Sequence, residues 1–447
     1  MRQVISVKLK LLHTPAQKSA LDAVSLAFRD GLNLTSTLAF EHGKTSSPKT
    51  LQSLAYRRLR NEHHLPSQLA SSCQKQVAAT YQGLWTKVKK NALAVKLGHT
   101  TRRYKGLDAP PKYVSRTLEY QINRDYSWKK DQVVSVLSLE GRLLIPYQGY
   151  SKHLELIKAG TPTGAAKLYY QKSRKQYYLL VSLTLDVPDP VPTDHPSIVG
   201  VDVGQRYLYV ATDREDRTLF ASGTQVRQKK DGFSRRIKSL RRKGTRSATR
   251  RLIALSGRER RFTADHNHVI SKALITRFPH ALIGMEDLTD IRERTERRSR
   301  PRADRQAAQQ GGLQERKAVR RRKNTRRRSQ WSFAELQAMI AYKATLAGSM
   351  PVKVHANFTS QCCPTCGHCS KGNRPNNGLN FVCEVCGKKG HADLMAGRNI
   401  ALRTLLVRQD WMSTGVLSIR PDVSYSETKA AHPQKYAELR WSTDTSL

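Results

Sequence analysis

The chain has 447 residues, enough for about three domains of ordinary size. Its 79 Lys and Arg residues outnumber 35 Asp and Glu residues, and the resulting formal charge of +44 calls for a polyanionic partner such as nucleic acid. No run of about 18 apolar residues is present, which excludes a membrane-spanning helix. The first residues also lack the apolar core of a secretory signal, so we expect a cytoplasmic protein.

The first 190 residues show a strand, then helices, then strands again. Residues 3–13 alternate loosely between apolar and polar, and Thr14-Pro15 is a helix-start signal followed by helical periodicity over 16–96. From about residue 117 the pattern becomes strand-like, which predicts a β-barrel interrupted by helices. The strand-like runs are 133–137, 142–146, 167–170 and 177–185.

The stretch 187–192 contains three prolines and is the clearest domain boundary in the chain. Beyond it the pattern alternates between strand and helix, which is typical of an α/β domain. The predicted strands are 198–203, 207–212, 281–285 and 352–354, and the predicted helical regions are 235–278, 331–347 and 392–407.

Two stretches carry much of the positive charge. Residues 227–262 hold 15 basic and two acidic residues, and residues 291–330 hold 16 basic and four acidic residues. By contrast, residues 408–447 hold five basic and five acidic residues. Arginine is the main basic residue of both stretches, and its guanidinium group suits phosphate and base contacts, although a solvated helix face or a localisation signal is the alternative. The candidate nucleic-acid-binding residues are Arg235, Arg236, Arg241, Arg242, Lys243, Arg250, Arg251, Arg320, Arg321, Arg322, Arg326, Arg327 and Arg328.

Three acids stand in unusual settings. Asp202 lies in an apolar strand between Gly200 and Gly204, Glu286 ends a second buried strand, and Asp393 begins a helix. Carboxylates in such places usually pair or bind metal, and two Mg²⁺ ions held by them would support phosphodiester hydrolysis. We expect the two glycines to let a phosphate backbone approach the strand.

Each acid also has an ordinary interpretation: Asp202 as a turn former, Glu286 as a strand-end acid and Asp393 as a helix N-cap. The occurrence of all three in one strongly basic α/β region favours a nuclease site. Because successive strand side chains face opposite ways, Glu286 and Asp287 are not expected to enter the same site.

Six of the seven cysteines lie between Cys362 and Cys386, a spacing typical of metal binding in a reducing compartment. Two C-x-x-C-G knuckles predict one closed, structural Zn²⁺ site. Its predicted ligands are Cys363, Cys366, Cys383 and Cys386. In an alternative assignment, Cys366 and Cys369 form the first ligand pair. Cys362 is interpreted as a spare thiol. His355 and His391 are not assigned as ligands, because four thiolates complete the coordination shell. Cys73 is interpreted as a core residue.

The motifs of this chain and their order resemble those of the TnpB family of transposon-encoded RNA-guided nucleases and of the related compact type V CRISPR effectors. The resemblance covers about residues 195–407. The motifs, in chain order, are Gly200-Val201-Asp202-Val203-Gly204, Met285-Glu286-Asp287-Leu288, Tyr342-Lys343-Ala344, Thr359-Ser360-Gln361, the paired knuckles, Asp393 and Asn399-Ile400. One departure is Ala396-Gly397, where the family often has two alanines, and the glycine should weaken that helix slightly.

The resemblance implies an α/β and β multidomain fold with an RNase H-like RuvC nuclease domain and an inserted zinc ribbon. The implied domains are a first wedge-barrel strand (1–13), a helical recognition insertion (14–100), the rest of the wedge barrel (101–190), RuvC with a basic helical region (191–354), a zinc-ribbon target-nucleic-acid-binding domain (355–390), the last RuvC segment (391–407) and a tail expected to be disordered (408–447).

The resemblance also implies an RNA-guided DNA endonuclease, prokaryotic and acting at the nucleoid. Its catalytic, metal-binding acids are Asp202, Glu286 and Asp393. The implied cofactors are two Mg²⁺ ions (Mn²⁺ is an option), one structural Zn²⁺ and a guide RNA, and the implied partner is double-stranded target DNA, with one chain per guide. Two alternatives stay open: a nuclease-inactive guided binder that represses transcription, and a basic zinc-ribbon protein that packages RNA.

Overall fold

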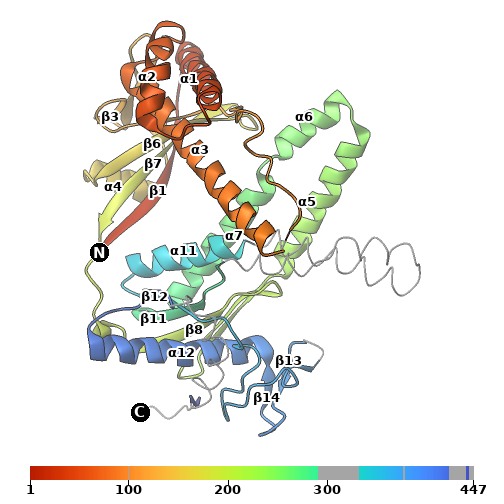
Figure 1. Ribbon diagram of the computed structural model, residues 1–447. Helices are drawn as coiled ribbons and strands as arrows, with labels where there is room; N and C mark the ends of the chain where they lie inside the picture. The colour runs from red at the N-terminus through yellow and green to blue at the C-terminus, as the bar shows by residue number, and fades with distance from the viewer. Residues whose placement is uncertain (99, 290–331, 376–377, 422–438, 442–447) are drawn as a thin grey trace. The chain divides into compact units, whose positions relative to one another are not determined.

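The computed structural model describes residues 1–98, 100–289, 332–375, 378–421 and 439–441 (Figure 1). The chain divides into two compact units, an N-terminal unit of residues 2–186 and a C-terminal unit that begins at Val187 and includes Met1. The division falls at the start of the proline-containing stretch 187–192. None of the described helices is both long and apolar enough to cross a membrane.

The N-terminal unit combines one antiparallel sheet with a group of three helices inserted after its first strand. Helix α1 begins where the Thr14-Pro15 signal predicts, and its start is a capping box in which Thr14 and Gln17 bond each other's backbone. The elements are β1 (Arg2–Leu11), α1 (Pro15–Glu41), α2 (Pro48–Asn61), α3 (Ser67–Lys96), β2 (Thr117–Tyr120), β3 (Tyr126–Lys129), β4 (Val133–Leu137), β5 (Arg142–Gln148), α4 (Ser151–Lys158), β6 (Thr163–Gln171) and β7 (Gln176–Asp186).

The sheet of this unit is a curled half-barrel, whereas the sequence predicts a barrel. Its strand order is β2-β6-β7-β1-β5-β4-β3, so β2 and β3 lie at opposite edges and are not ladder partners. Six interstrand steps would separate them by about 29 Å in a flat sheet, but the chain from Tyr120 to Tyr126 spans at most about 21 Å. The sheet must therefore curl. The short edge strands, of four residues each, leave the barrel open.

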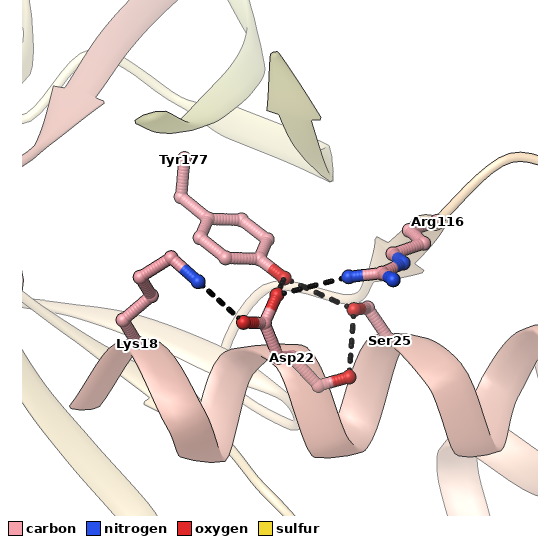
Figure 2. A network of polar contacts seen from close by, with 5 residues as sticks. All are labelled: Lys18, Asp22, Ser25, Arg116 and Tyr177. Carbon is pink, nitrogen blue, oxygen red and sulfur yellow. Dashed lines mark hydrogen bonds and ion pairs between the residues drawn. The ribbon is translucent and has the colours of Figure 1, made fainter. Parts of the chain in front are cut away.

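A polar network joins helix α1 to the sheet (Figure 2). The Asp22 carboxylate accepts hydrogen bonds from Lys18 (2.5 Å), Tyr177 on β7 (2.7 Å) and Arg116 (3.2 Å), and Ser25 contacts the Tyr177 hydroxyl at 3.1 Å. Burial alone would raise the pKa of Asp22, but its hydrogen bonds and cationic neighbours lower the pKa below its ordinary value. The network therefore fixes the helical group on the strand that precedes the second unit.

The C-terminal unit contains a mixed sheet of order β10-β9-β8-β11-β12. Strands β8, β11 and β12 run parallel, and β9 and β10 are antiparallel to their neighbours. Its described elements are β8 (Ser197–Asp202), β9 (Tyr207–Asp213), β10 (Thr218–Ser222), α5 (Thr224–Lys243), α6 (Arg246–Leu255), α7 (Arg258–Arg277), β11 (Ala281–Glu286), α11 (Phe333–Leu346), β12 (Met350–Val354), β13 (Asn380–Val382), β14 (Lys389–His391) and α12 (Ala392–Thr414).

Helices cover both faces of this sheet. Val199 and Val201 point toward α7 and α11, whose apolar side chains form one buried cluster with them. On the other face, Gly200 and Gly284 are register partners in the centre of the sheet, and α12 lies directly over them (Figure 1). Gly200 accepts the backbone of α12 at close range, and Gly284 accepts the side chains of Thr404 and Ile400 from the same helix.

The tail, which is expected from the sequence to be disordered, is described only at residues 408–421 and 439–441. Helix α12 continues past residue 407 to Thr414, and Trp411 is buried, with its ring 6.0 Å from that of His195. Further along, the Ile419 carbonyl accepts a hydrogen bond from the backbone of Lys353, and Trp441 donates one to the carbonyl of Pro364. The described part of the tail is therefore packed, because Trp411 and Trp441 provide contacts that a neutral overall charge does not reveal.

Candidate active site and zinc centre

Three acids from separate segments line one cleft. Asp202 ends β8 and Glu286 ends β11, and the register of these parallel strands places the two acids side by side on the same face. Asp393 lies in the first turn of α12, which crosses that face, and the N-cap of this helix is His391 and not Asp393. The cleft they share has a volume of about 440 Å³.

The pKa values of Asp202 and Glu286 are raised above their ordinary values. Burial raises the pKa of Asp202 well above its ordinary range, and the negative charges of Glu286 and Asp393 raise it further. Burial also raises the pKa of Glu286, while a short hydrogen bond from Thr359 opposes the shift. Three carboxylates that repel one another around an open cleft are a donor set that suits Mg²⁺, whose charge would relieve the repulsion. The donor chemistry of the three acids therefore suits the expected metal, whereas among the described residues only the four cysteine sulfurs form a group within 4.8 Å of one another.

Asp287 lies outside this cleft, as the alternation of strand side chains predicts. Its carboxylate accepts hydrogen bonds from the backbone and the hydroxyl of Thr289, and it lies 3.7 Å from the ammonium group of Lys353. Burial would raise the pKa of Asp287, but these hydrogen bonds lower it. Two adjacent acids thus have different environments.

Of the two glycines beside Asp202, Gly200 has another role than the one predicted. A Cβ added at Gly200 would meet the Gly397 carbonyl and the Ala401 backbone of α12, so the space is filled by a helix and is closed to a phosphate. At Gly397 of α12, an added Cβ would lie 3.6 Å from the Gly200 carbonyl oxygen and 3.3 Å from the Thr212 side chain. Only Gly204 lines the cleft. The glycine in Ala396-Gly397 therefore serves helix packing.

Two further residues of the cleft have no assigned role from sequence. Thr359 donates to Glu286, and its own carbonyl accepts a hydrogen bond of 2.7 Å from Asn399 on α12. Arg374 lies 3.5 Å from Asp393 and donates to the carbonyl of Gly378. Thr359 belongs to the motif Thr359-Ser360-Gln361, whereas a single arginine between the two knuckles gives no signal.

The four predicted zinc ligands meet in space. The sulfur atoms of Cys363, Cys366, Cys383 and Cys386 all lie within 4.8 Å of one another. The Cys363–Cys386 and Cys366–Cys383 sulfur pairs are 3.6 and 3.4 Å apart, close to the roughly 3.8 Å that a tetrahedral Zn²⁺ with 2.3 Å bonds requires. The residues fit a structural zinc ion.

The glycine of each knuckle adopts the predicted tight turn. Gly367 and Gly387 have φ values of +77° and +69°, and their amides donate to the carbonyls of Cys363 and Cys383. The strand pair β13–β14 then leads directly into α12, and Ala392 donates to the carbonyl of Leu379. The zinc centre therefore lies next to Asp393 in the chain.

The remaining cysteines are not part of the cluster. Cys362, predicted as a spare thiol, forms a disulfide with Cys369, which removes Cys369 from the alternative assignment of ligands. His355 and His391 also lie outside the group of four sulfurs. Cys73 is fully buried in the N-terminal unit, and burial raises the pKa of its thiol, in agreement with a core residue.

The predicted basic residues fall into two groups. Those on α5 and α6 are exposed, and none forms an ion pair with an acid in the described parts of the chain. They are Arg235, Arg236, Arg241, Arg242, Lys243, Arg250 and Arg251. The others lie outside the described residues: Arg320, Arg321, Arg322, Arg326, Arg327 and Arg328.

A family model matches part of the C-terminal unit. The model described as "Cas12f1-like, TNB domain" matches residues 333–400. This range includes helix α11, all four cysteines of the sulfur cluster and Asp393.

Several curated proteins are similar to the chain. The CRISPR-associated endodeoxyribonuclease Cas12f1 of Sulfoacidibacillus thermotolerans is 26% identical over 253 residues, which are 53% of this chain and 53% of that protein. The TnpB-like protein MJ0751 of Methanocaldococcus jannaschii is 28% identical over 47% of this chain and 69% of its own. The putative RNA-guided DNA endonuclease InsQ of Escherichia coli is 25% identical over 283 residues, which are 61% of this chain and 65% of that protein. The match thus spans about half to two thirds of these relatives.

Proposed function

Since the chain is related to the TnpB/Cas12f-like family of RNA-guided endonucleases, we propose that it is itself an RNA-guided DNA endonuclease. The observation that carries the proposal is the meeting of Asp202, Glu286 and Asp393 around one cleft of a strongly basic chain. A packaging protein would have no use for three acids gathered around one cleft, two of them with raised pKa values. The activity, the guide RNA and the DNA target are all part of the proposal.

The cleft residues have separate roles in this proposal. Asp202, Glu286 and Asp393 would hold two Mg²⁺ ions, which would activate the attacking water and stabilise the leaving oxygen of the phosphodiester. Thr359 holds the Glu286 carboxylate in place through its hydroxyl. Arg374 reaches the cleft from the segment between the knuckles and would bind a phosphate oxygen of the DNA strand.

The proposal assigns the remaining segments to nucleic acid. The half-barrel and helices α1–α3 would act as the wedge and recognition domains that hold the guide–target heteroduplex, and base pairing would supply most of the sequence specificity. The zinc ribbon would help to load the target strand. The exposed arginines of α5 and α6 would bind phosphates, so binding should weaken steeply with salt. One chain would serve one guide.

The test begins with the RNA that co-purifies with the chain when it is expressed with its flanking DNA. A discrete species with a constant scaffold and a variable end is expected, and the variable end defines a target for a Mg²⁺-dependent cleavage assay. A heterogeneous sample of cellular RNA would instead support the packaging alternative.

Single substitutions then test which acids are required for cleavage. Asp202→Asn and Glu286→Gln should abolish cleavage and leave guide and target binding nearly intact. Asp287→Asn is the matched control, because this acid is adjacent in sequence but lies outside the cleft. Cleavage retained by the Asp202 or Glu286 variant would remove that residue from the site, and target binding without cleavage by the unaltered protein would support the repressor alternative.

A further inference from the structure

We propose that three aromatic side chains beside the cleft form a stacking surface for one base of the single DNA strand that is to be cut. The residues are Tyr207 on β9, Phe220 on β10 and His391 at the start of α12, and we call them the aromatic shelf. The inference rests on the proposed function, which supplies the strand.

The shelf is a compact group of rings. The ring centroids are 5.3 Å apart for Tyr207 and Phe220, 5.2 Å for Tyr207 and His391, and 5.4 Å for Phe220 and His391, and all three pairs meet edge to face. This is the favoured geometry for aromatic pairs, so the rings hold one another in position. Phe220 is nevertheless 39% exposed, which leaves apolar ring surface in contact with solvent.

Strand register links the shelf to the first acid. Asp202 is paired with Val210, and Val210 is paired with Phe220, so these residues form one row across β8, β9 and β10. Directly opposed residues in antiparallel strands point to the same face. Phe220 therefore lies on the face that carries Asp202, two interstrand spacings or about 10 Å away along the row.

The backbone of α12 links the shelf to the third acid. The Nδ1 atom of His391 accepts a hydrogen bond of 3.3 Å from the amide of Asp393, which fixes the ring two residues before the carboxylate. Arg206, next to Tyr207 in the chain, lines the same cleft as Asp393. The loop before Tyr207 is held in turn, because the Gly223 amide donates to the Arg206 carbonyl.

This arrangement of groups matches a nucleotide of a single strand. The acids and Arg206 line the cleft in which, under the proposed function, metal ions and phosphates would be bound. The shelf adds an apolar π-surface close in the chain to two of these lining residues, Arg206 and Asp393. Bases within a duplex expose only their edges, whereas an unpaired base can place its face on an aromatic ring. Stacking of one base typically changes affinity by about 5- to 150-fold, whatever its sequence.

The consequence for the reaction is positional. A base held on the shelf would set which phosphate reaches the acids, so Phe220 would be a substrate-positioning residue. Loss of the ring should slow cleavage by about 5- to 100-fold and spread the cut over neighbouring phosphates.

The test combines one protein variant with one modified nucleotide. A single abasic site is moved through the strand around the cut, and cleavage by the guided complex is followed at each position. In the unaltered protein one position should slow cleavage and broaden the cut. With Phe220→Ala the same abasic site should have no further effect, since both changes remove one contact. An undiminished abasic effect, or a Phe220→Ala variant with the original rate and cut position, would overturn the proposal.

Additional variants separate stacking from folding. Phe220→Tyr retains the ring and should restore the abasic effect, whereas Phe220→Leu retains apolar bulk and should not. Val269→Ala, at an exposed apolar side chain of α7, is the control for a general surface effect.

A binding readout separates this inference from the proposed function. Single-stranded DNA containing 2-aminopurine is mixed with the purified protein, and quenching of the probe reports stacking without any cleavage. Quenching that disappears in Phe220→Ala supports the shelf even if the protein never cuts DNA. Equal quenching in both proteins, or none in either, refutes the shelf even if cleavage is observed.

Discussion

Substitution of Gly200 by alanine should separate the two halves of the acidic cleft. Gly200 lies in the centre of β8, and α12 crosses it with its own backbone in the position that a side chain would occupy. A Cβ there would lie 3.0 Å from Ala401 Cα and closer still to the Gly397 carbonyl oxygen and the Ala401 amide nitrogen. Since these are backbone atoms, no side-chain rotation can relieve the overlap.

The size of the effect follows from this geometry. Carbon atoms normally approach to about 3.5 Å, so α12 must move away from β8 by on the order of 1 Å. Overpacking of this kind costs about 1–3 kcal/mol, which in a domain of this size lowers the melting temperature by roughly 2–12 °C. Because α12 carries Asp393 and β8 carries Asp202, a displacement of about 1 Å should also slow the proposed cleavage by about 100-fold.

Thermal unfolding of the variant, followed by a cleavage assay at a temperature where it is folded, measures both effects. Gly232→Ala is the matched control, since Gly232 lies in α5 with no atom within 4 Å of an added Cβ. In a helix this change should stabilise by about 0.5–1 kcal/mol. A Gly200→Ala protein with unchanged melting temperature and cleavage rate would refute the close packing of α12 on β8.

Three further changes test other parts of the molecule. Cys366→Ser should lose one equivalent of zinc in metal analysis, whereas Cys369→Ser should retain it. Zinc retained by Cys366→Ser and lost by Cys369→Ser would show that the assignment of the four ligands is wrong. Asp22→Asn should cost the N-terminal unit about 1–2 kcal/mol at pH 7 in denaturant unfolding. Because folding lowers the pKa of Asp22, its contribution to the free energy of unfolding is present above about pH 4 and is lost as pH falls through the lower folded-state pKa. If the stability of Asp22→Asn falls with acid as steeply as that of the unaltered protein, this role of Asp22 is contradicted. Thr359→Val should weaken cleavage about 10- to 100-fold and raise the Mg²⁺ concentration needed, because Glu286 loses a hydrogen bond to its charged form; an unchanged Mg²⁺ titration would argue against that role.

Local sequence signals predicted most elements of the fold. Thr14-Pro15 marks the start of α1, and the apolar strands that end at Asp202 and Glu286 stand out because both faces of a parallel sheet are covered. The regular spacing of the knuckles likewise predicted the four sulfur ligands, since a ligand set of this type is local in sequence.

Features that depend on distant parts of the chain were not predictable in this way. The curl of the half-barrel follows from which strands lie at its edges, and the role of Gly200 follows from a helix that begins almost 200 residues later. The contact of Arg374 with Asp393 has the same origin. The end of α12 was missed because Trp411 looks like any apolar residue of a neutral tail until its packing against His195 is seen.

The order of segments has a consequence for synthesis on the ribosome. All strands of the half-barrel lie within residues 2–186, whereas the acidic cleft needs Asp393. At about 5–20 residues per second, roughly 10–40 seconds pass between emergence of the first unit and of the last acid. The unit that we propose to hold the guide can therefore fold and engage RNA while the cutting centre is still incomplete, so a nascent chain would be able to acquire its specificity before it becomes able to damage DNA.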